Sequence, residues 1–230
     1  METVAVIPCR NEAKYVGRVV RQAKKQVDMV VVSDGLSTDK TVVIAKKAGA
    51  VVIGAVPGTQ TGYGICMRRG IKWVIGEYKP DVVVILDGDG QHNPAEIPVL
   101  LELIKQGADV VMGCRTEGNM PSYRRSGNKL LTFVCNLGAK FRPPDAVTGY
   151  WALKTHSVPD LTEKKWGVAI ELLIKSRSNG SKMAFVPIKA IYHEHYEDNS
   201  TTSPVKLALT LLWLIVKWRV ICEVLRRKEK

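Results

Sequence analysis

Two aspartates separated by a single glycine follow an uninterrupted apolar run of the chain. Residues 82–94 read VVVILDGDGQHNP, which places Asp87, Asp89 and Gln91 at alternate positions. Two carboxylates at the end of a buried strand face desolvation and mutual repulsion, and an ordinary turn would need neither. A hard divalent cation such as Mg²⁺ or Mn²⁺ prefers oxygen ligands and would relieve the repulsion. The spacing therefore predicts a metal site at these three residues, and the alternative is a solvated acidic loop.

Short apolar runs alternate with helical patterns and would carry these residues to the edge of a sheet. The runs are rich in valine, as strands buried on both faces should be. They cover residues 4–8, 29–34, 50–54, 82–87 and 108–113. Segments of helical length and spacing cover residues 12–26, 38–48, 62–77 and 94–106. This alternation predicts an α/β fold with a doubly wound, mainly parallel sheet, whose ligands bind at the carboxyl ends of the strands.

The residues after the acidic turn carry the signals of a helix start. Asn93 suits the N-cap, Pro94 the first helical position and Glu96 the first turn. We expect residues 1–200 to form one α/β domain. Residues 201–230 should form a separate C-terminal helix after a polar linker.

The chain carries a strong positive charge that attracts polyanions. Its 34 Lys and Arg exceed its 22 Asp and Glu and give a formal net charge of +12, which suits nucleic acid, anionic lipid or a phosphorylated substrate. A hydrophobic content of 46% excludes a disordered chain. The five cysteines form no CxxC pair, which argues against a zinc ribbon or disulfide framework and favours a reducing compartment. A strand pattern starts within three residues of Met1, so we expect no signal peptide and a cytoplasmic catalytic part.

The acidic segment and five further motifs resemble family 2 glycosyltransferases with the GT-A fold. DGDGQHNP is similar to the D-A-D-G-Q-H-x-P signature of the branch that contains dolichyl-phosphate mannose synthases and other polyprenyl-phosphate glycosyltransferases. The other matching motifs follow in the family's order and are IPCRNE (7–12), DGLSTD (34–39), GCR (113–115), RRSGN (124–128) and DAVTGY (145–150). The match covers about residues 4–190, and the ordered combination is more specific than any single motif.

The resemblance implies a binding site for a nucleotide sugar. It assigns donor contacts to Pro8, Arg10, Asn11, Glu12, Asp34, Gly62, Gly64, Asp87, Gly88 and His193. A carboxylate at a strand end suits two ribose hydroxyls, which supports Asp34 in this role; a helix cap or turn is its alternative. Gly62 and Gly64 lie in QTGYGICMRRG (60–70), where glycines and an arginine would adjoin the donor diphosphate. Such glycines also occur in plain turns.

Two arginines after the metal motif are candidates for binding the acceptor, and a nearby aspartate is a candidate for positioning. Arginine forms paired, charge-assisted hydrogen bonds with phosphate, so Arg115 and Arg125 are predicted to hold an acceptor phosphate, with a solvated basic face as the alternative. In relatives that act on hydroxyl groups, a carboxylate in the region of Asp145 is implied to be a general base. A phosphate acceptor needs no base, so Asp145 is expected to position Arg125 or the donor sugar. Asp89, Arg115, Arg125 and Asp145 are the catalytic candidates.

The chain departs from the family pattern near residue 193. Relatives place a diphosphate-contacting arginine after the V-P-I motif, whereas this chain has VPIK (186–189) and later HEH (193–195). His193 is expected to stand in for that arginine, which leaves the identity of the donor open. Histidines at this spacing with no third ligand nearby make a poor zinc site.

These residues together predict a metal-dependent, inverting transfer of a hexose to a lipid phosphate. The expected donor is GDP-mannose, the acceptor is dolichyl or another polyprenyl phosphate, and the cofactor is Mg²⁺ or Mn²⁺. Alternatives within the class are UDP-glucose, a UDP-N-acetylhexosamine or a lipid-linked sugar acceptor. A nucleic-acid-binding module is the alternative from another class, but RRSGNKLL offers neither interleaved aromatics nor a recognition helix, so nucleic acid is not an expected partner.

The C-terminal segment predicts a membrane-associated helix. LALTLLWLIV (207–216), between Lys206 and Lys217, is shorter than the roughly 20 residues that a transmembrane helix needs. On a helical wheel these lysines share one side with Thr210 and Trp213, so we expect an interfacial helix with a leucine surface toward lipid. A core helix packed on the catalytic domain is the alternative. The expected location is the cytoplasmic face of a membrane, peripheral or monotopic, with membrane lipids as partners.

Overall fold

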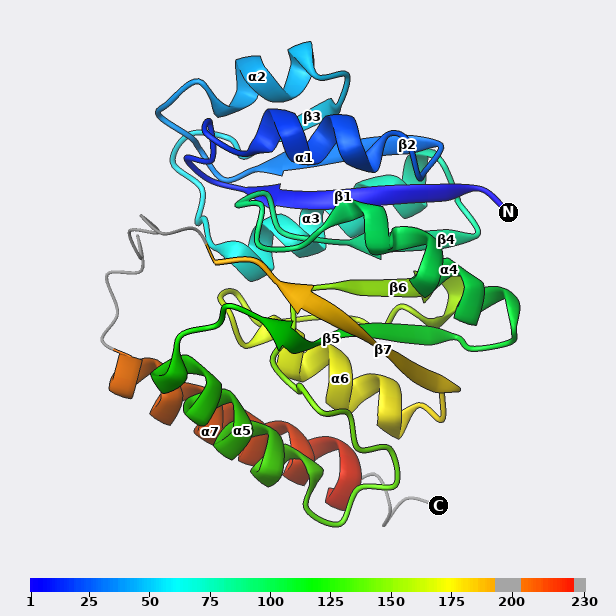
Figure 1. The fold of residues 1–230 in the computed structure, drawn as a ribbon, viewed down its shortest axis with the longest axis vertical. Coiled ribbons are helices and arrows are strands. Elements are labelled where there is room, and N and C mark those ends of the chain that lie inside the picture. Colours follow the sequence, from blue (N-terminus) through cyan, green and yellow to red (C-terminus); the bar gives the residue numbers. More distant parts are fainter. Residues whose placement is uncertain (193–203, 226–230) are drawn as a thin grey trace.

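A seven-stranded sheet runs through the centre of the molecule and carries helices on both faces (Figure 1). The computed structural model describes residues 1–192 and 204–225. Its strands are β1 (Thr3–Cys9), β2 (Met29–Asp34), β3 (Val51–Gly54), β4 (Val82–Ile85), β5 (Val110–Gly118), β6 (Trp151–Lys154) and β7 (Met183–Ala190). They lie in the order β3-β2-β1-β4-β6-β5-β7, and β6 is antiparallel to both neighbours while the other pairs are parallel.

The predicted alternation of strands and helices is present, with boundaries that differ by a few residues. The helices are α1 (Val16–Ala23), α2 (Thr41–Lys47), α3 (Tyr63–Glu77), α4 (Ile97–Lys105), α5 (Ser122–Asn136), α6 (Val168–Ser178) and α7 (Pro204–Arg219). Short 3₁₀ turns cover Pro94–Glu96 and Thr155–Ser157, and a π-helical turn, Val220–Leu225, continues α7.

Alternate strand residues fill two hydrophobic cores, one on each face of the sheet. Val4 and Val6 of β1 belong to a core that includes side chains of α3, α5, α6 and α7. Ala5 and Ile7 belong to a second core with α1, α2 and α4. Strands covered on both faces bury every side chain, which explains the valine-rich runs. The predicted doubly wound, mainly parallel sheet is therefore confirmed.

The order of the strands reverses between β1 and β4. From β1 the chain adds β2 and then β3 on one side, and it later places β4 on the other side of β1. The loops after two such strands turn in opposite directions, and ligands of doubly wound sheets bind between them. Residues 10–12 follow β1 and residues 87–91 follow β4, so the fold brings predicted donor and metal residues to one edge.

The acidic turn leads directly into a capped helix, as predicted. Asn93 Oδ1 accepts a hydrogen bond of 3.1 Å from the Ala95 N–H, and Pro94 occupies the first turn. Gly90 has a φ of 76°, a conformation that glycine adopts without strain. The two aspartates are thus held between the end of a strand and the start of a helix.

Helix α7 packs against α5 and α6, and its inner side belongs to the protein core. Its buried side chains are Leu211, Leu214, Ile215 and Trp218, followed by Cys222 in the π-helical turn. The predicted leucine surface toward lipid is therefore wrong, because most of these apolar side chains face the protein. The opposite side of the helix, with Leu209, Trp213 and Val216, is exposed instead.

Helices α5 and α7 lie side by side at the end of the molecule far from α2 (Figure 1). No helix within residues 1–192 and 204–225 is long and apolar enough to cross a membrane. The predicted domain boundary at residue 200 falls outside the described residues. Cys9, Cys66, Cys114, Cys135 and Cys222 are all free and buried, as expected for a chain without a disulfide framework.

Candidate active site

The carboxylates of Asp87 and Asp89 lie just beyond the carboxyl end of β4. The Tyr63 hydroxyl donates a hydrogen bond of 2.7 Å to Asp87 Oδ1. The Asp87 N–H donates to His92 Nδ1 over 3.3 Å, and the Gln91 N–H donates to Asp89 Oδ1 over 2.9 Å. Gln91 and His92 are themselves buried. The Tyr63 hydroxyl therefore orients the Asp87 carboxylate, and the turn itself orients the Asp89 carboxylate.

Burial and mutual repulsion oppose the charged forms of the acids at this edge. Burial raises the pKa of Asp89 to about 7, and the charge of Asp87 adds to the effect. Burial also raises the pKa of Glu12 to about 8, and repulsion from the charges of Asp89 and Asp87 adds to this rise. Because Glu12 follows β1, carboxylates from two strand ends act on the same region. A bound cation would stabilise all three charges.

The side chains present suit a hard divalent cation that binds together with a ligand. Carboxylate, amide and water oxygens are the ligands that Mg²⁺ and Mn²⁺ prefer. Within the described ranges, no three His, Cys, Asp or Glu side chains converge on one point. Asp87, Asp89 and Gln91 would therefore supply part of a coordination shell, with phosphate oxygens and water as the other ligands. Their metal role stays a prediction.

Two glycines allow the backbone to pack closely around Asp87. A Cβ atom on Gly149 would lie 2.7 Å from Asp87 Oδ2 and 3.0 Å from the Tyr63 hydroxyl. A Cβ atom on Gly88 would lie 2.3 Å from Cys9 Sγ. Gly88 therefore allows the turn to pack against β1. This packing does not test the predicted contact of Gly88 with the donor, which stays a prediction.

Side chains predicted to bind the donor tie together the loops after β1 and β2. Asp34 is 4% exposed and accepts hydrogen bonds from the Ser37 N–H (3.0 Å) and the Ser37 hydroxyl (2.5 Å). The Asn11 N–H donates to Ser37 Oγ over 2.9 Å, and Asn11 Oδ1 accepts from the Thr38 N–H over 2.8 Å. The turn role that is the alternative for Asp34 is thus present. Contact with a ribose stays a prediction.

The remaining donor candidates on this side differ in their surroundings. Pro8 is buried within β1, opposite Ser33 of β2, whereas Arg10 is exposed just after the strand. His193 lies outside the described residues. The donor contacts of all three stay predictions.

Gly62 and Gly64, at the start of α3, lie against the backbone of residues 163–165. A Cβ atom on Gly62 would come within 2.5 Å of the Lys164 carbonyl oxygen, and one on Gly64 within 2.4 Å of the Glu163 carbonyl oxygen. Both glycines are therefore required for a close contact between two backbone segments. This packing role was not evident from the sequence.

The arginines that follow these glycines bind protein carbonyl groups. Arg68 Nη1 donates to the Leu161 carbonyl over 2.9 Å. Arg69 Nη2 donates to Ser33 Oγ over 3.1 Å and to the Asp34 carbonyl oxygen. Both arginines of this segment are thus engaged within the protein, Arg69 at the end of β2 and Arg68 at a neighbouring loop.

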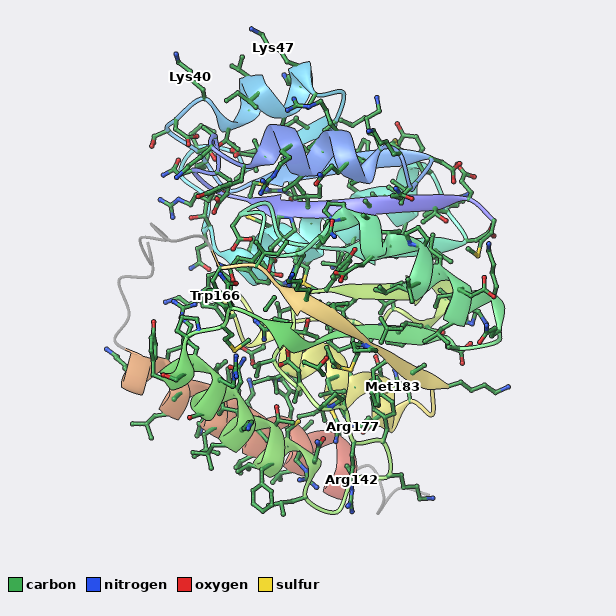
Figure 2. The ribbon with its side chains drawn as sticks, viewed as in Figure 1. Lys40, Lys47, Arg142, Trp166, Arg177 and Met183 are labelled. Atoms are coloured by element: carbon green, nitrogen blue, oxygen red, sulfur yellow. The ribbon has the colours of Figure 1, made fainter. Side chains whose placement is uncertain are left out.

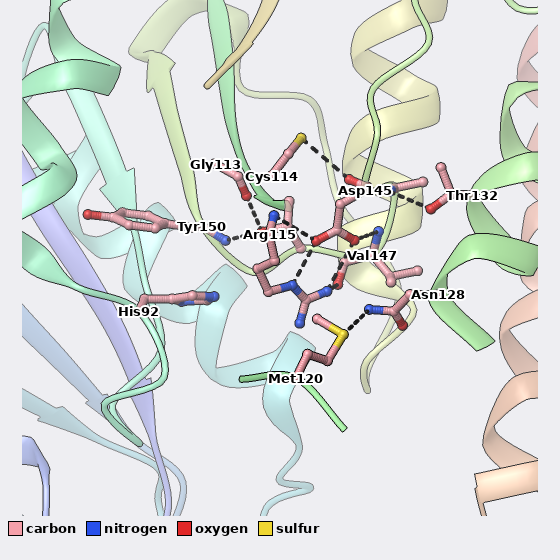
Figure 3. Close-up of polar contacts among 12 residues, drawn as sticks. His92, Gly113, Cys114, Arg115, Met120, Asn128, Thr132, Asp145, Val147 and Tyr150 are labelled. Carbon is pink, nitrogen blue, oxygen red and sulfur yellow. Dashed lines mark hydrogen bonds and ion pairs between the residues drawn. The ribbon is translucent and has the colours of Figure 1, made fainter. Parts of the chain in front are cut away.

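Arg115 and Asp145 form a buried ion pair (Figure 3). Arg115 Nε donates to Asp145 Oδ2 over 2.7 Å, and Nη2 donates to Oδ1 over 3.1 Å. The backbone N–H groups of Arg115 and Val147 also donate to this carboxylate, each over 3.2 Å. The structure thus corrects the predicted partner of Asp145, which orients Arg115 rather than Arg125. Because its oxygens already accept several hydrogen bonds, Asp145 is poorly suited to take a proton from a substrate.

The ion pair keeps a positive charge beside the acidic turn. Burial opposes the charged form of Arg115, but the Asp145 carboxylate and its hydrogen bonds outweigh burial and hold the pKa of Arg115 above its ordinary value. The charge of Arg115 in turn favours the ionised form of Asp89. Among the described residues, no acceptor contacts Nη1 of Arg115. This nitrogen can therefore donate to an oxygen of a bound anion.

Arg125 lies on the first turns of α5 and is exposed. Its Nη2 lies 3.4 Å from the carbonyl oxygens of Gly118 and Met120, which precede the helix. Met120 also contacts Asn128, close to the Arg115–Asp145 pair (Figure 3). The structure therefore gathers Asp87, Asp89 and Arg115 at the edge of the sheet and leaves Arg125 at the surface of the same region.

Three aromatic residues contribute to the site although the sequence analysis gave them no role. Trp166 lies near the carboxyl edge of the sheet (Figure 2) and stacks on Tyr63, with ring centroids 4.6 Å apart and an interplanar angle of 21°. Burial lowers the pKa of His92, and its Nδ1 accepts a hydrogen bond, so the ring is neutral. Tyr63 and His92 were considered only as parts of longer motifs, and Trp166 lies in a loop without a motif, so the sequence analysis assigned none of the three a role of its own.

The family model described as Glycosyl transferase family 2 matches residues 4–174, which include the acidic turn and the Arg115–Asp145 pair. The chain belongs to this family. The positive charge of the chain was also compatible with a nucleic-acid-binding module. The match to the family model identifies the chain as a glycosyltransferase instead.

Two curated relatives match the glycosyltransferase over most of their length. A Dolichyl-phosphate hexose transferase of Haloferax volcanii is 34% identical over 198 residues, which cover 81% of this chain and 82% of the relative. A UDP-N-acetylglucosamine–dolichyl-phosphate N-acetylglucosaminyltransferase of Methanococcus voltae is 26% identical, with 92% and 94% covered. Their names confirm the resemblance to the polyprenyl-phosphate branch.

A solved structure confirms the GT-A fold of the glycosyltransferase. Glucosyl-3-phosphoglycerate synthase from Mycobacterium tuberculosis, in complex with Mn²⁺, UDP and phosphoglyceric acid, superimposes with a TM-score of 0.72. The alignment covers 96% of this chain and 78% of that one at 20% sequence identity. At this low sequence identity, the comparison supports the fold alone and not a particular activity.

Proposed function

We propose that this glycosyltransferase transfers a hexose, with inversion, from a nucleotide sugar to the phosphate group of dolichyl or another polyprenyl phosphate. One observation carries the proposal. The acidic turn of Asp87 and Asp89, suited to a cation with a diphosphate, lies in the electrostatic field of Arg115, which has an unengaged Nη1. A site with these two features can hold two phosphate-bearing substrates at once. The dolichyl-phosphate acceptors in the relatives' names agree with this chemistry.

In the proposed reaction, Glu12 and Asp34 bind the nucleoside at the ends of β1 and β2. Asp87, Asp89 and Gln91 hold a divalent cation. When bound, the cation stabilises the negative charge that develops on the departing diphosphate. Mn²⁺ and UDP are present together in the solved structure of the same fold, which supports this part of the proposal.

The acceptor needs no general base in this scheme. A phosphate oxygen, already anionic at neutral pH, attacks the anomeric carbon while the bond to the diphosphate breaks on the opposite face. The nucleoside diphosphate leaves with the electron pair. Arg115 orients the attacking phosphate through Nη1 and is itself oriented by Asp145. The engagement of Asp145 with Arg115 supports a phosphate acceptor over a hydroxyl acceptor.

The identity of the donor can be tested by measuring how much each nucleotide sugar raises the melting temperature of the protein, with and without Mn²⁺. GDP-mannose is the donor predicted from the sequence, and UDP-glucose and UDP-N-acetylglucosamine are the alternatives, which gain support from the UDP in the names of the relative and of the solved structure. At a concentration about 100 times its dissociation constant, the true donor should raise the melting temperature by roughly 5 to 10 °C, and only with the cation. Transfer from that donor to a polyprenyl phosphate would confirm the function. A panel that neither stabilises nor reacts would contradict it.

Replacing Arg125 with Ala should raise the KM for polyprenyl phosphate about tenfold and leave the KM for the donor nearly unchanged. The reason is the loss of one charge-assisted contact with phosphate, worth about 1.5 to 3 kcal/mol. Steady-state kinetics with each substrate varied in turn measures the effect. Lys47→Ala, an exposed basic residue on α2 at the other end of the molecule, is the control and should leave both KM values unchanged. Equal damage to both substrates would place Arg125 at the donor diphosphate.

Arg115 requires a milder change, because its removal leaves Asp145 buried without its partner. Breaking such a pair destabilises a protein by about 3 to 5 kcal/mol. Arg115→Lys keeps the charge but lacks the planar fork. We expect this variant to fold and to show the same selective rise in the acceptor KM.

The outer side of α5 and α7 offers a surface for the membrane that carries the acceptor. Leu130 and Phe133 on α5, and Leu209 and Trp213 on α7, each expose more than 60% of their surface. Exposed lysines, among them Lys129 and Lys206, occur on the same helices. We propose that the protein binds the cytoplasmic face of an anionic membrane peripherally through these helices.

The double variant Phe133→Glu/Trp213→Glu should lose at least about tenfold in affinity for vesicles of anionic phospholipid. Insertion of one large apolar side chain contributes about 1.5 to 3 kcal/mol, and 1.4 kcal/mol corresponds to a factor of about ten. Co-sedimentation with vesicles measures the loss. Val43→Glu on α2, an equally drastic change of an exposed residue at the other end of the molecule (Figure 1), should have no effect. Unchanged binding of the double variant would exclude α5 and α7 as the membrane surface.

A further inference from the structure

Asp87 is held in place from two sides by groups outside the acidic turn. The Tyr63 hydroxyl donates a hydrogen bond of 2.7 Å to Oδ1. Oδ2 faces the backbone of Gly149 so closely that a Cβ atom there would lie 2.7 Å away. Tyr63 therefore determines how this carboxylate is presented.

Tyr63 is in turn fixed by residues 161–166, which we call the strap. Trp166 stacks on the Tyr63 ring at a centroid distance of 4.6 Å. The Ile65 N–H donates to the Lys164 carbonyl over 3.3 Å, and Lys164 Nζ donates to Gln60 Oε1 over 2.9 Å. The strap thus contacts the chain on both sides of Tyr63.

A buried carboxylate holds the strap itself. Glu171 of α6 is fully buried and pairs with Lys175 over 2.7 Å. Its two oxygens accept hydrogen bonds from the Thr162 N–H (2.9 Å), the Thr162 hydroxyl (2.8 Å) and the Glu163 N–H (2.7 Å). Buried charge-assisted hydrogen bonds of this kind are strong and give a segment one defined position.

The strap is also joined to α7, the helix proposed to meet the membrane. Glu163 Oε1 accepts hydrogen bonds from Lys217 Nζ over 2.8 Å and from Trp218 Nε1 over 3.0 Å. Next to the strap, Gly167 lies so close to Leu214 of α7 that a Cβ atom would come within 2.3 Å of its Cδ1. A continuous chain of contacts therefore leads from α7 through the strap and Tyr63 to Asp87.

We propose that Tyr63 and Trp166 are positioning residues for the cation-binding carboxylate Asp87, with the strap as their support. The inference rests on the proposed function, because it takes Asp87 as a ligand of the divalent cation. Groups that hydrogen-bond to metal-binding carboxylates fix their orientation, and their loss weakens metal binding about 10- to 100-fold. The stacked Trp166 limits the motion of Tyr63 and so acts on the same carboxylate from one step further away.

Tyr63→Phe tests the proposal, because it removes the hydroxyl and keeps the stacked ring. Binding of Mn²⁺ is measured directly by electron paramagnetic resonance, with GDP and separately with UDP present. We expect binding about 10- to 100-fold weaker than in the wild-type protein. Tyr78→Phe, the same change at the other end of α3, is the matched control and should bind Mn²⁺ normally. Melting temperatures show that each variant is folded.

Trp166 gives a second, independent test. Its side chain is 50% exposed, so Trp166→Ala removes little of the core. We expect weaker Mn²⁺ binding in Trp166→Ala and substantial recovery in Trp166→Phe, which can still stack on Tyr63. Normal Mn²⁺ binding in both Tyr63→Phe and Trp166→Ala would overturn the inference alone. A wild-type protein that binds no Mn²⁺ with either nucleotide would overturn the proposed function as well.

Discussion

Replacing Asp89 with Asn is expected to abolish sugar transfer and leave the fold intact. The change removes one charge from the proposed cation site, and the several kcal/mol that a cation contributes to the transition state correspond to about a thousandfold in rate or more. The Asn side chain keeps the oxygen that accepts the Gln91 N–H bond. A transfer assay at saturating Mg²⁺ or Mn²⁺ measures the loss.

The same variant should be more stable than the wild-type protein when no cation is added. Burial and the charge of Asp87 disfavour the ionised form of Asp89, and Asn carries no charge. Functional sites often hold such unfavourable charges. The exposed Asp160, changed to Asn, is the control and should alter neither activity nor melting temperature. Near-normal turnover of Asp89→Asn would show that the metal assignment is wrong.

The layout of the sheet could be predicted because its signals are local. Valine-rich runs mark strands that are covered on both faces, and Asn93-Pro94 marks the start of a helix. Once the strands are known to be parallel, their carboxyl ends must share one edge. Glu12, Asp34 and Asp87 therefore came together in the prediction as they do in the structure, although they lie far apart in the sequence.

The partner of Asp145 could not be predicted in this way. Arg115 and Arg125 are both downstream of the metal motif, and both suit a carboxylate or a phosphate. Only the packing of β5 beside the loop before β6 brings the Arg115 side chain onto Asp145. Arg125 lies on the helix that follows β5 and remains exposed. The choice is made by tertiary structure, which the spacing of residues does not reveal.

The orientation of α7 was ambiguous for a different reason. The helix is apolar almost all round, so the position of a few polar residues was the basis of the prediction. Lys217 was assigned to the solvent side, but it pairs with Glu163 of the strap over 2.8 Å. A lysine can reach back along the helix to such a partner. Leu211 and Leu214 turn inward, whereas Leu209, Trp213 and Val216 turn outward.

This arrangement leads to the second large effect, which concerns deletion of residues 204–230. If residues 201–230 formed a separate membrane-associated helix, as the sequence predicted, such a truncation would release the protein from membranes, cripple transfer to long-chain polyprenyl phosphate and preserve nucleotide-sugar binding. The structure instead predicts that the truncated protein unfolds. Leu211, Leu214, Ile215 and Trp218 are buried in the core on the α6 face of the sheet. At about 1.5 to 3 kcal/mol for each side chain, their loss approaches the whole stability of an average domain, about 5 to 15 kcal/mol.

Circular dichroism and thermal melting of the truncated protein test this expectation, with Phe133→Glu/Trp213→Glu for comparison. The double variant changes only the outer side of α5 and α7, so it should bind vesicles more weakly and keep its melting transition. The truncated chain should lose that transition, because the core on the α6 face would be opened and Glu163 of the strap would lose Lys217 and Trp218. A truncated protein that melts normally and still binds Mn²⁺ with nucleotide would show that α7 is a separable unit. In that case the contacts between α7 and the strap would contribute nothing to the site, and α7 and the proposed catalytic site would act independently.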